Sequence, residues 1–397
     1  MISQAVILAG GKGSRLGELT HNIPKPLLNV SGKPFIEYLI WNLSRHGVQD
    51  IIIMAGFRSE KLKDKYNNKK MFNSFIKVIS EDTPLGTAGC LLNSIDELDD
   101  EFFILNGDTY FDFDLINLFN ENKKFDGVCL LGAYSKETKR FGSINFDEEF
   151  YVESFNEKSE TNREGVINTG TYLFRKKFLK SFQNGPLSME EEVFKYLSQN
   201  KKLKVLIQEG YFIDIGIPES FQKAEKDFPD IVIKPALFFD RDGTLNYDKG
   251  YTHKPEDLKF IDGVKNTIKR AIKKGFYIVV VTNQGGISKG VFSEEQMIDF
   301  NNRLLESIRD YGGNIDSIYF CKHHPEAPNF NDRSCSCRKP EPGLILQALK
   351  ELPIDKEKSI MIGDKVSDVD AGINAGIKAL LFEETNLEAF LAEENII

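Results

Sequence analysis

Short apolar runs alternate with amphipathic, helix-like segments along this chain, and the alternation starts afresh near residue 230. In the first half we expect strands at 5–9, 51–55, 102–105 and 127–133, and a helix at 35–46. In the second half we expect strands at 236–239, 276–281, 317–320 and 359–362, and helices at 294–311 and 342–352. Strands that alternate with helices build sheets flanked by helices, so both halves are predicted to be α/β.

The length of 397 residues exceeds the usual size of one compact domain, so we expect two, at 1–230 and 231–397, joined by a short connection. Hydrophobic residues make up 41% and charged residues 28% of the chain, which is typical of a globular protein. The net charge of -9 argues against general binding to nucleic acid or anionic membranes. Phosphorylated substrates would therefore have to be bound by local cations, helix N-termini and metal ions.

The N-terminal apolar run at 5–9 is too short to span a bilayer, and it lacks the basic flank and cleavage site of a signal peptide. The chain has five cysteines, three of which crowd together as Cys321, Cys335 and Cys337. A secreted disulfide framework would spread its cysteines along the chain. We therefore expect a cytoplasmic protein that has no membrane partner.

A glycine-rich turn with the sequence GGKGSRL follows the first expected strand, at 10–16. Such a turn lets backbone N–H groups approach phosphate oxygens, and Lys12 and Arg15 add positive charge. A simple tight turn is the alternative, and neither the P-loop ending nor the Rossmann spacing is present. The prolines on both sides of Lys25 restrain its backbone, which suits the presentation of an ammonium group to a phosphate.

These motifs resemble the opening of the sugar-1-phosphate nucleotidyltransferases, with Ser14 where that family has threonine, and the resemblance covers about residues 3–225. It implies a Rossmann-like (GT-A-like) mixed sheet and transfer of a nucleotidyl group from a nucleoside triphosphate to a sugar 1-phosphate. The implied nucleotide site comprises Leu8, Ala9, Gly10, Gly11, Gly13, Arg15, Lys25, Glu81, Pro84, Gly86, Thr87 and Asp108.

The same resemblance implies that Asp108 and Asp214 hold Mg²⁺, a hard cation suited to carboxylates and phosphate oxygens. Arg15 and Lys25 would act in catalysis by stabilising the α-phosphate and the leaving pyrophosphate. Taken singly, Asp108 could be a turn aspartate, but the motifs occur jointly and in order. The implied sugar-phosphate site comprises Glu157, Lys158, Asn168 and Thr169.

The second half opens with an apolar strand that ends in Asp240, within the sequence DRDGTL at 240–245. This resembles the first motif of the haloacid-dehalogenase-like (HAD) phosphatases. The resemblance implies that Asp240 is the nucleophile that forms an aspartyl-phosphate and that Asp242 is the general acid/base. A calcium loop is the alternative, which the preceding strand and the following Gly-Thr-Leu disfavour.

The other HAD motifs follow in order. Thr282 would hold the phosphoryl group, Lys339 would neutralise its charge, and Asp364 would bind Mg²⁺ together with Asp240 and the backbone carbonyl of Asp242. Residues expected to bind the sugar phosphate here are Asn283, Arg338 and Lys339. Two more aspartates are expected to have supporting or structural roles, Asp368 and Asp370.

A Cys-x-His and a Cys-x-Cys pair lie between these motifs and provide Cys321, His323, Cys335 and Cys337. Three thiolates and an imidazole suit tetrahedral Zn²⁺, and a site with four protein ligands is structural. This zinc would pin the loop that carries the basic residues at 338–339. The alternatives are buried free cysteines or a strained Cys335–Cys337 disulfide, and His324 is the spare histidine.

The zinc loop, DRDGT and Thr-Asn-Gln motifs resemble the heptose-bisphosphate phosphatases over about residues 236–383, with Gly285 where serine is usual. Histidinol-phosphate phosphatases share the loop, and no insertion long enough for a large cap is evident. Such a heptose phosphatase yields heptose 1-phosphate, which a nucleotidyltransferase can consume. The resemblances thus imply a bifunctional enzyme of nucleotide-activated heptose synthesis, with GTP expected from pathway analogy.

Two alternatives stay open at this point. The same two chemistries could serve other substrates, such as a hexose 1-phosphate with dTTP or CTP, another phosphosugar, or histidinol phosphate. The second alternative is a sugar-nucleotide-sensing scaffold with one inactive half. The intact aspartates of both sites argue against this alternative. A homo-oligomer is compatible with the sequence.

Overall fold

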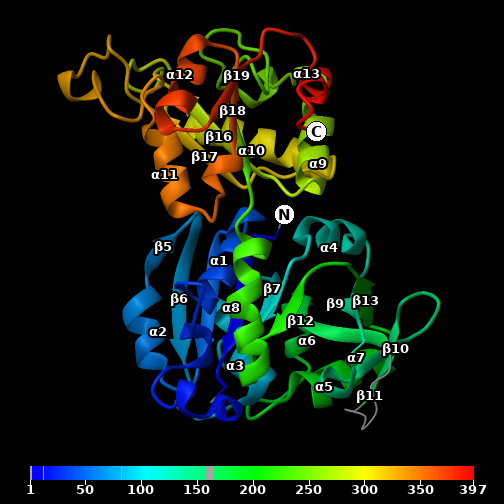
Figure 1. Ribbon diagram of the computed structural model, residues 1–397. Coiled ribbons are helices and arrows are strands. Elements are labelled where there is room, and N and C mark those ends of the chain that lie inside the picture. The colour runs from blue at the N-terminus through cyan, green and yellow to red at the C-terminus, as the bar shows by residue number, and fades with distance from the viewer. Residues whose placement is uncertain (1, 12, 82, 137, 157–163) are drawn as a thin grey trace. The chain divides into compact units, whose positions relative to one another are not determined.

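The computed structural model describes residues 2–11, 13–81, 83–136, 138–156 and 164–397 (Figure 1). The chain divides into two compact units, Met1–Ile231 and Val232–Ile397. Helix α8 (Pro218–Val232) runs through the position where the sequence suggested a short connection, with Pro229 inside it. The non-helical connection is therefore only 233–235.

The first unit is built on an eight-stranded mixed sheet with the strand order β13-β9-β12-β7-β1-β4-β6-β5. Strands β7, β1, β4 and β6 run parallel to one another, whereas β12 runs antiparallel to both β7 and β9, and β5 runs antiparallel to β6. The strands of this sheet are β1 (Gln4–Ala9), β4 (Asp50–Ala55), β5 (Lys69–Met71), β6 (Ser74–Ser80), β7 (Glu101–Asn106), β9 (Val128–Ser135), β12 (Gly165–Arg175) and β13 (Leu203–Ile207).

Shorter strand pairs and helices complete the first unit. The paired short strands are β2 (Asn29–Val30) with β3 (Lys33–Pro34), β8 (Thr109–Phe111) with β14 (Phe212–Asp214), and β10 (Ser143–Phe146) with β11 (Val152–Asn156). The other α-helices are α1 (Phe35–Arg45), α2 (Ser59–Tyr66), α3 (Gly86–Asn93), α4 (Leu115–Asn122), α5 (Thr138–Phe141), α6 (Lys176–Leu179) and α7 (Lys195–Gln199).

The apolar runs form the central strands of this sheet because helices cover both faces of a parallel sheet and leave little polar surface. Accordingly, nearly all of β1 is buried. Helix α8 continues past the predicted boundary because Phe228 is buried against α1. Its ring centroid lies 5.8 Å from that of Phe35 and 4.8 Å from that of Tyr38. This packing outweighs the local cost of Pro229.

The second unit contains a five-stranded parallel sheet with the order β17-β16-β15-β18-β19. Its strands are β15 (Ala236–Phe239), β16 (Tyr277–Asn283), β17 (Ser317–Cys321), β18 (Ile360–Gly363) and β19 (Lys378–Leu381). Its helices are α9 (Val264–Lys273), α10 (Glu294–Asp310), α11 (Gly343–Glu351), α12 (Val366–Ala375) and α13 (Leu387–Glu393). The prediction of two α/β domains, the first with a mixed sheet, is confirmed.

The parallel sheet gathers the HAD motifs at one edge, because the carboxyl ends of parallel strands meet there. Asp240 follows β15, Thr282 lies at the end of β16, and Asp364 follows β18. Among the described residues, no helix has the length and apolar character needed to cross a membrane.

Candidate active sites

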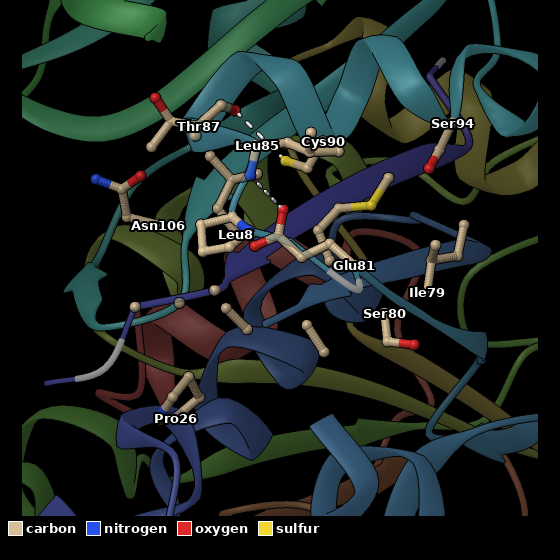
Figure 2. A pocket seen from close by; sticks show the side chains of 18 of the residues that line it. Leu8, Pro26, Ile79, Ser80, Glu81, Leu85, Thr87, Cys90, Ser94 and Asn106 are labelled. Carbon is tan, nitrogen blue, oxygen red and sulfur yellow. Dashed lines mark hydrogen bonds between the residues drawn. The ribbon is translucent and has the colours of Figure 1, made fainter. Parts of the chain in front are cut away.

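A cavity of about 380 Å³ opens in the first unit where β1 and β7 end (Figure 2). All of the predicted nucleotide-binding residues line it except Gly13 and Arg15. Met54, Ile79, Leu85 and Cys90 give the cavity apolar walls. An apolar cleft with a few placed polar groups suits a flat, polar ligand such as a nucleobase.

Glu81 lies among these lining residues, with Thr87 and Asn106 toward one end of the cavity and Ile79 and Ser94 toward the other (Figure 2). Its Oε2 accepts a hydrogen bond from the Leu85 N–H at 3.0 Å. A Cβ atom on Gly56 would lie 2.7 Å from the Gly10 carbonyl oxygen and 2.9 Å from Glu81 Oε1. The close approach of these segments therefore requires glycine at position 56.

Asp108 and Asp214 are brought together by the antiparallel pair β8–β14, and the Ile215 N–H donates to the Asp108 carbonyl oxygen at 2.9 Å. Each carboxylate holds a cation: Lys25 Nζ lies 2.6 Å from Asp108 Oδ2, and Arg140 Nη2 lies 2.6 Å from Asp214 Oδ1. Burial raises the pKa of Asp214, and the charge of Asp108 raises it further.

A second cavity of about 260 Å³ is lined by four more of the predicted residues, Arg15, Asn168, Thr169 and Asp214, whereas Gly13 lines neither cavity. It shares two lining residues with the first cavity, Asn106 and Glu190, so the two cavities adjoin. The predicted sugar-phosphate residues Glu157 and Lys158 lie outside the described residues.

The lining residues that were not predicted include Asn106, Arg140 and Glu190. Asn106 ends β7 next to the expected aspartate, and this position at a strand end could have indicated it. Glu190 opens a run of three glutamates, which in sequence resembles a solvated face. Arg140 lies on the four-residue helix α5, and no motif in the sequence marks it.

In the second unit, Asp240 is buried, and this burial raises its pKa to about 6. Lys339 Nζ lies 2.5 Å from Asp240 Oδ1 and 2.7 Å from Asp368 Oδ1, and it donates to the Val281 carbonyl oxygen at 2.8 Å. Among the described residues, nothing donates a hydrogen bond to Asp240 Oδ2. The nucleophile expected from the sequence thus has one oxygen held by a cation and the other available.

Carboxylate oxygens of Asp240, Asp364 and Asp368 lie within 4.8 Å of one another. Gly243 allows this arrangement, because its φ is +98° and a Cβ atom there would lie 2.2 Å from Asp364 Oδ2. Asp368, which was expected to have only a supporting or structural role, is the third carboxylate of this group. The carboxylate of Asp242 is not part of the group.

The Asp242 carboxylate is instead held by donors. Oδ2 accepts from Arg241 Nη2 at 2.7 Å and from Gln284 Nε2 at 2.8 Å, and Oδ1 accepts from Asn246 Nδ2 at 2.9 Å. Arg241 is completely buried, with its guanidinium 4.5 Å from the centroid of the Phe300 ring. This buried arginine fixes the orientation of Asp242, a role that the sequence did not indicate.

The remaining predicted groups hold one another as well. Asn283 Oδ1 accepts from the Lys339 N–H, and Asn283 Nδ2 donates to the Lys339 carbonyl oxygen, both at 3.1 Å. Thr282 Oγ1 accepts from Gln284 Nε2 at 2.9 Å. Arg338 Nη1 donates to the His323 carbonyl oxygen at 2.8 Å, which ties this cation to the cysteine-rich loop.

In that loop, Cys321, His323, Cys335 and Cys337 converge. The sulfur atoms lie 3.1–3.5 Å apart, and His323 Nδ1 lies 3.5 Å from Cys321 Sγ and 3.4 Å from Cys337 Sγ. Zn–S bonds of ~2.3 Å in a tetrahedron would place sulfur atoms ~3.8 Å apart, whereas a disulfide needs ~2.05 Å. The free thiols and this spacing fit a shared metal ion.

Comparisons with known proteins agree with the division into two units. The nucleotidyl transferase family matches residues 4–230, and the HAD-hydrolase-like family matches residues 336–386. D-glycero-beta-D-manno-heptose-1,7-bisphosphate 7-phosphatase of Haemophilus influenzae is 48% identical over 143 residues, which cover 36% of this chain and 78% of that protein.

The first unit has relatives of its own. D-glycero-alpha-D-manno-heptose 1-phosphate guanylyltransferase of Campylobacter jejuni is 37% identical over 223 residues, which cover 55% of this chain and 96% of that protein. The crystal structure of HddC from Yersinia pseudotuberculosis is 34% identical, has a TM-score of 0.52, and covers 57% of this chain and 100% of its own. A second HddC structure is a complex with GMP-PN, at the same identity and TM-score.

Proposed function

The chain belongs to the nucleotidyl transferase family and carries an HAD phosphatase as its second unit, and we propose that this bifunctional enzyme makes a nucleotide-activated heptose in two consecutive steps. The second unit removes the phosphate at O7 of D-glycero-D-manno-heptose 1,7-bisphosphate. The first unit then transfers GMP from GTP to heptose 1-phosphate and releases pyrophosphate. One observation carries this proposal: relatives named for these two reactions match the two units of a single chain.

The anomer follows from the same pairing. The phosphatase relatives are named for the β-anomer and the guanylyltransferase relative for the α-anomer. Hydrolysis at O7 breaks no bond at C1, so the anomer of the bisphosphate is the anomer of the product. For the steps to be consecutive, the phosphatase unit of this chain must accept the α-anomer.

In the phosphatase step, the uncoordinated Oδ2 of Asp240 attacks the phosphorus atom at O7, and the bond from phosphorus to the sugar oxygen breaks. Asp242 donates a proton to that oxygen and then takes one from the water that hydrolyses the aspartyl-phosphate. Lys339 offsets the charge of the phosphoryl group from its position against Asp240. Arg241, Gln284 and Asn246 keep the Asp242 carboxylate oriented between the two half-reactions.

In the transferase step, a phosphate oxygen of heptose 1-phosphate attacks the α-phosphorus of GTP, and the bond to pyrophosphate breaks. The adjoining cavities support this assignment, since the donor and the acceptor have to meet at one phosphorus atom. Lys25 and Arg15 offset the charge on the phosphates, and Gly10 and Gly11 let the backbone approach them.

Both families use Mg²⁺, and the donor sets of this chain fit such an ion. Asp108 and Asp214 in the first unit, and Asp240, Asp364 and Asp368 in the second, offer the hard carboxylate oxygens that Mg²⁺ prefers. When bound, Mg²⁺ neutralises phosphate charge at both sites. The cluster of three cysteines and His323 would hold a structural Zn²⁺, with His324 left out of it.

The test is an assay panel. Purified enzyme with Mg²⁺ receives each anomer of heptose 1,7-bisphosphate together with GTP, ATP, CTP, UTP or dTTP, while phosphate, pyrophosphate and nucleotide-sugar are followed separately. We expect the α-anomer with GTP to yield all three products. Phosphate release without nucleotide-sugar for every combination would contradict the proposal, and turnover with another nucleotide would reassign the base.

A further inference from the structure

Glu190 is a carboxylate at the junction of the two cavities of the first unit, and only Asn106 shares that position among the described residues. A negative charge is unexpected in a site for two phosphorylated substrates, because it repels phosphate. We infer that Glu190 is a specificity-determining residue that accepts hydrogen bonds from hydroxyl groups of the acceptor sugar. This inference deepens the transferase half of the proposed function and rests on it.

The fold holds the segment that carries Glu190 firmly against helix α3. The Leu187 N–H donates to the Leu85 carbonyl oxygen at 2.9 Å, and the Leu187 carbonyl oxygen accepts from the Ala88 N–H at 3.0 Å. Thr87 Oγ1 then accepts from the Met189 N–H at 2.8 Å. Glu190 therefore has a fixed backbone next to the nucleotide cavity.

The Glu190 carboxylate can accept further hydrogen bonds from a ligand. Oε2 lies 3.4 Å from Thr87 Oγ1, which is a weak contact, and Oε1 accepts no hydrogen bond from any described residue. By contrast, the other carboxylate that lines the second cavity, Asp214, is paired with Arg140 at 2.6 Å. Among the residues that the structure describes, no cation forms an ion pair with Glu190, so its carboxylate is a negatively charged acceptor.

The chemistry of the ligand follows from the surrounding charges. Arg15 and Arg140 line the second cavity and provide positive charge for the phosphates that meet there. The rest of a sugar 1-phosphate presents hydroxyl groups, which are hydrogen-bond donors, and a carboxylate is a strong partner for them. Glu190 can hold the sugar ring while the cations hold its phosphate, so the reacting oxygen is oriented from both sides.

Glu190 lines the second cavity together with the predicted sugar-binding residue Asn168. Asn168, which lines only the second cavity, donates from Nδ2 to Tyr172 Oη at 3.0 Å. Burial raises the pKa of Tyr172, and the negative charges of Glu190 and Asp108 raise it further. A ribose hydroxyl of the nucleotide is the competing partner, since Thr87 lies on the nucleotide side.

The test compares Glu190→Gln and Glu190→Ala with Glu191→Gln, whose side chain lines neither cavity. The substrate is whichever of heptose 1-phosphate and a set of hexose 1-phosphates the wild-type enzyme turns over best, so a wrong heptose assignment leaves this comparison intact. We expect Glu190→Ala to raise KM for the sugar 1-phosphate ~10-fold or more, as for loss of a charged hydrogen bond. KM for the nucleotide should change less than ~2-fold, and Glu191→Gln should behave as wild type.

Analogues of the sugar 1-phosphate that each lack one hydroxyl group separate binding from structure. Wild-type enzyme should bind the analogue that lacks the contacted hydroxyl more weakly than it binds the complete sugar 1-phosphate. Glu190→Ala should bind this analogue and the complete sugar 1-phosphate with equal affinity. A raised KM for the nucleotide alone would transfer Glu190 to the ribose and overturn the inference. The inference would also be overturned if wild-type enzyme lost the same affinity for every analogue. It would likewise be overturned if Glu190→Ala weakened the binding of both substrates and lowered the thermal unfolding midpoint, because this result indicates a structural role.

Discussion

Gly243 shows how one residue can decide whether a site forms. Its φ of +98° is in the left-handed region that favours glycine, and the space where a Cβ would lie is filled by the Asp364 carboxylate. The motif glycine after the two aspartates therefore serves the convergence of Asp240 and Asp364. The sequence shows that a glycine is present, whereas only the fold shows that position 364 lies against it.

We predict that Gly243→Ala lowers phosphate release by about 100-fold or more, because displacing a reacting group by ~1 Å has that effect. Nucleotidyl transfer should be unchanged, since the first unit contains its own site. The matched control is Gly250→Ala, which has a φ of +81° but nothing within 4 Å of its Cβ position. Equal loss in both variants would mean that backbone strain, and not the clash with Asp364, causes the effect.

Arg241 is a second case at this scale. Its buried guanidinium donates to Asp242 Oδ2 from both Nε and Nη2, at 3.1 and 2.7 Å. We predict that Arg241→Lys lowers kcat of the phosphatase ~10-fold or more, because a lysine keeps the charge but cannot provide the planar pair of donors. KM for the bisphosphate should change little, because the Arg241 side chain is completely buried and is not exposed to a bound substrate. A change confined to KM would contradict the positioning role.

At the scale of elements, the loop between β17 and α11 links the cysteine cluster to the phosphatase site. Cys335 and Cys337 are followed directly by Arg338 and Lys339, and Lys339 reaches Asp240. Any ion held by the cluster therefore fixes the start of the segment that delivers the two cations. This arrangement explains why a structural metal would matter for a reaction in which it takes no part.

We predict that the protein carries about one zinc ion per chain and that Cys335→Ser loses it, because three ligands bind zinc less firmly than four. Phosphate release should fall while nucleotidyl transfer stays. Ser334→Ala, next to it in the loop, should retain both the metal and the activity. Zinc content far below one per wild-type chain, measured by atomic absorption, would refute the four-ligand cluster.

Elements were predictable from sequence where local pattern determines them. The central strands are apolar throughout, and the motif aspartates directly follow them, so strand ends and motif residues could be assigned together. Helix α8 differs, because Pro229 suggested a break and the packing of Phe228 against Phe35 and Tyr38 outweighs that local preference. Tertiary contacts of this kind leave no signal in a single sequence.

The same distinction holds for the candidate sites. The motif residues were identified because their order and spacing matched known families. Arg140 contacts Asp214, and Arg241 contacts Asp242. Glu190 lines both cavities. These positions depend on how the whole chain folds. Charged residues outside a motif are common on surfaces, so only the folded chain shows that these three line the cavities or contact a site aspartate.

At the scale of the whole molecule, the chain has two compact units, each with its own carboxylates and cations for one of the two proposed reactions. Asp108 and Asp240 belong to different units, so removal of one charge should leave the other site intact. In the proposed function, fusion supplies both activities in equal amounts, and the product of the phosphatase unit is the substrate of the transferase unit.

The most direct test of this account compares wild type, Asp240→Asn and Asp108→Asn with α-heptose 1,7-bisphosphate, GTP and Mg²⁺. Asp370→Asn, an exposed aspartate on α12, is the control and should behave as wild type. Nucleotide-sugar is measured by chromatography, before and after heptose 1-phosphate is added. We predict that neither active-site variant forms nucleotide-sugar from the bisphosphate. Added heptose 1-phosphate should restore product only with Asp240→Asn, and Asp108→Asn should still release phosphate. Loss of both activities in either variant, or product from the bisphosphate with Asp240→Asn, would contradict two consecutive reactions at separate sites.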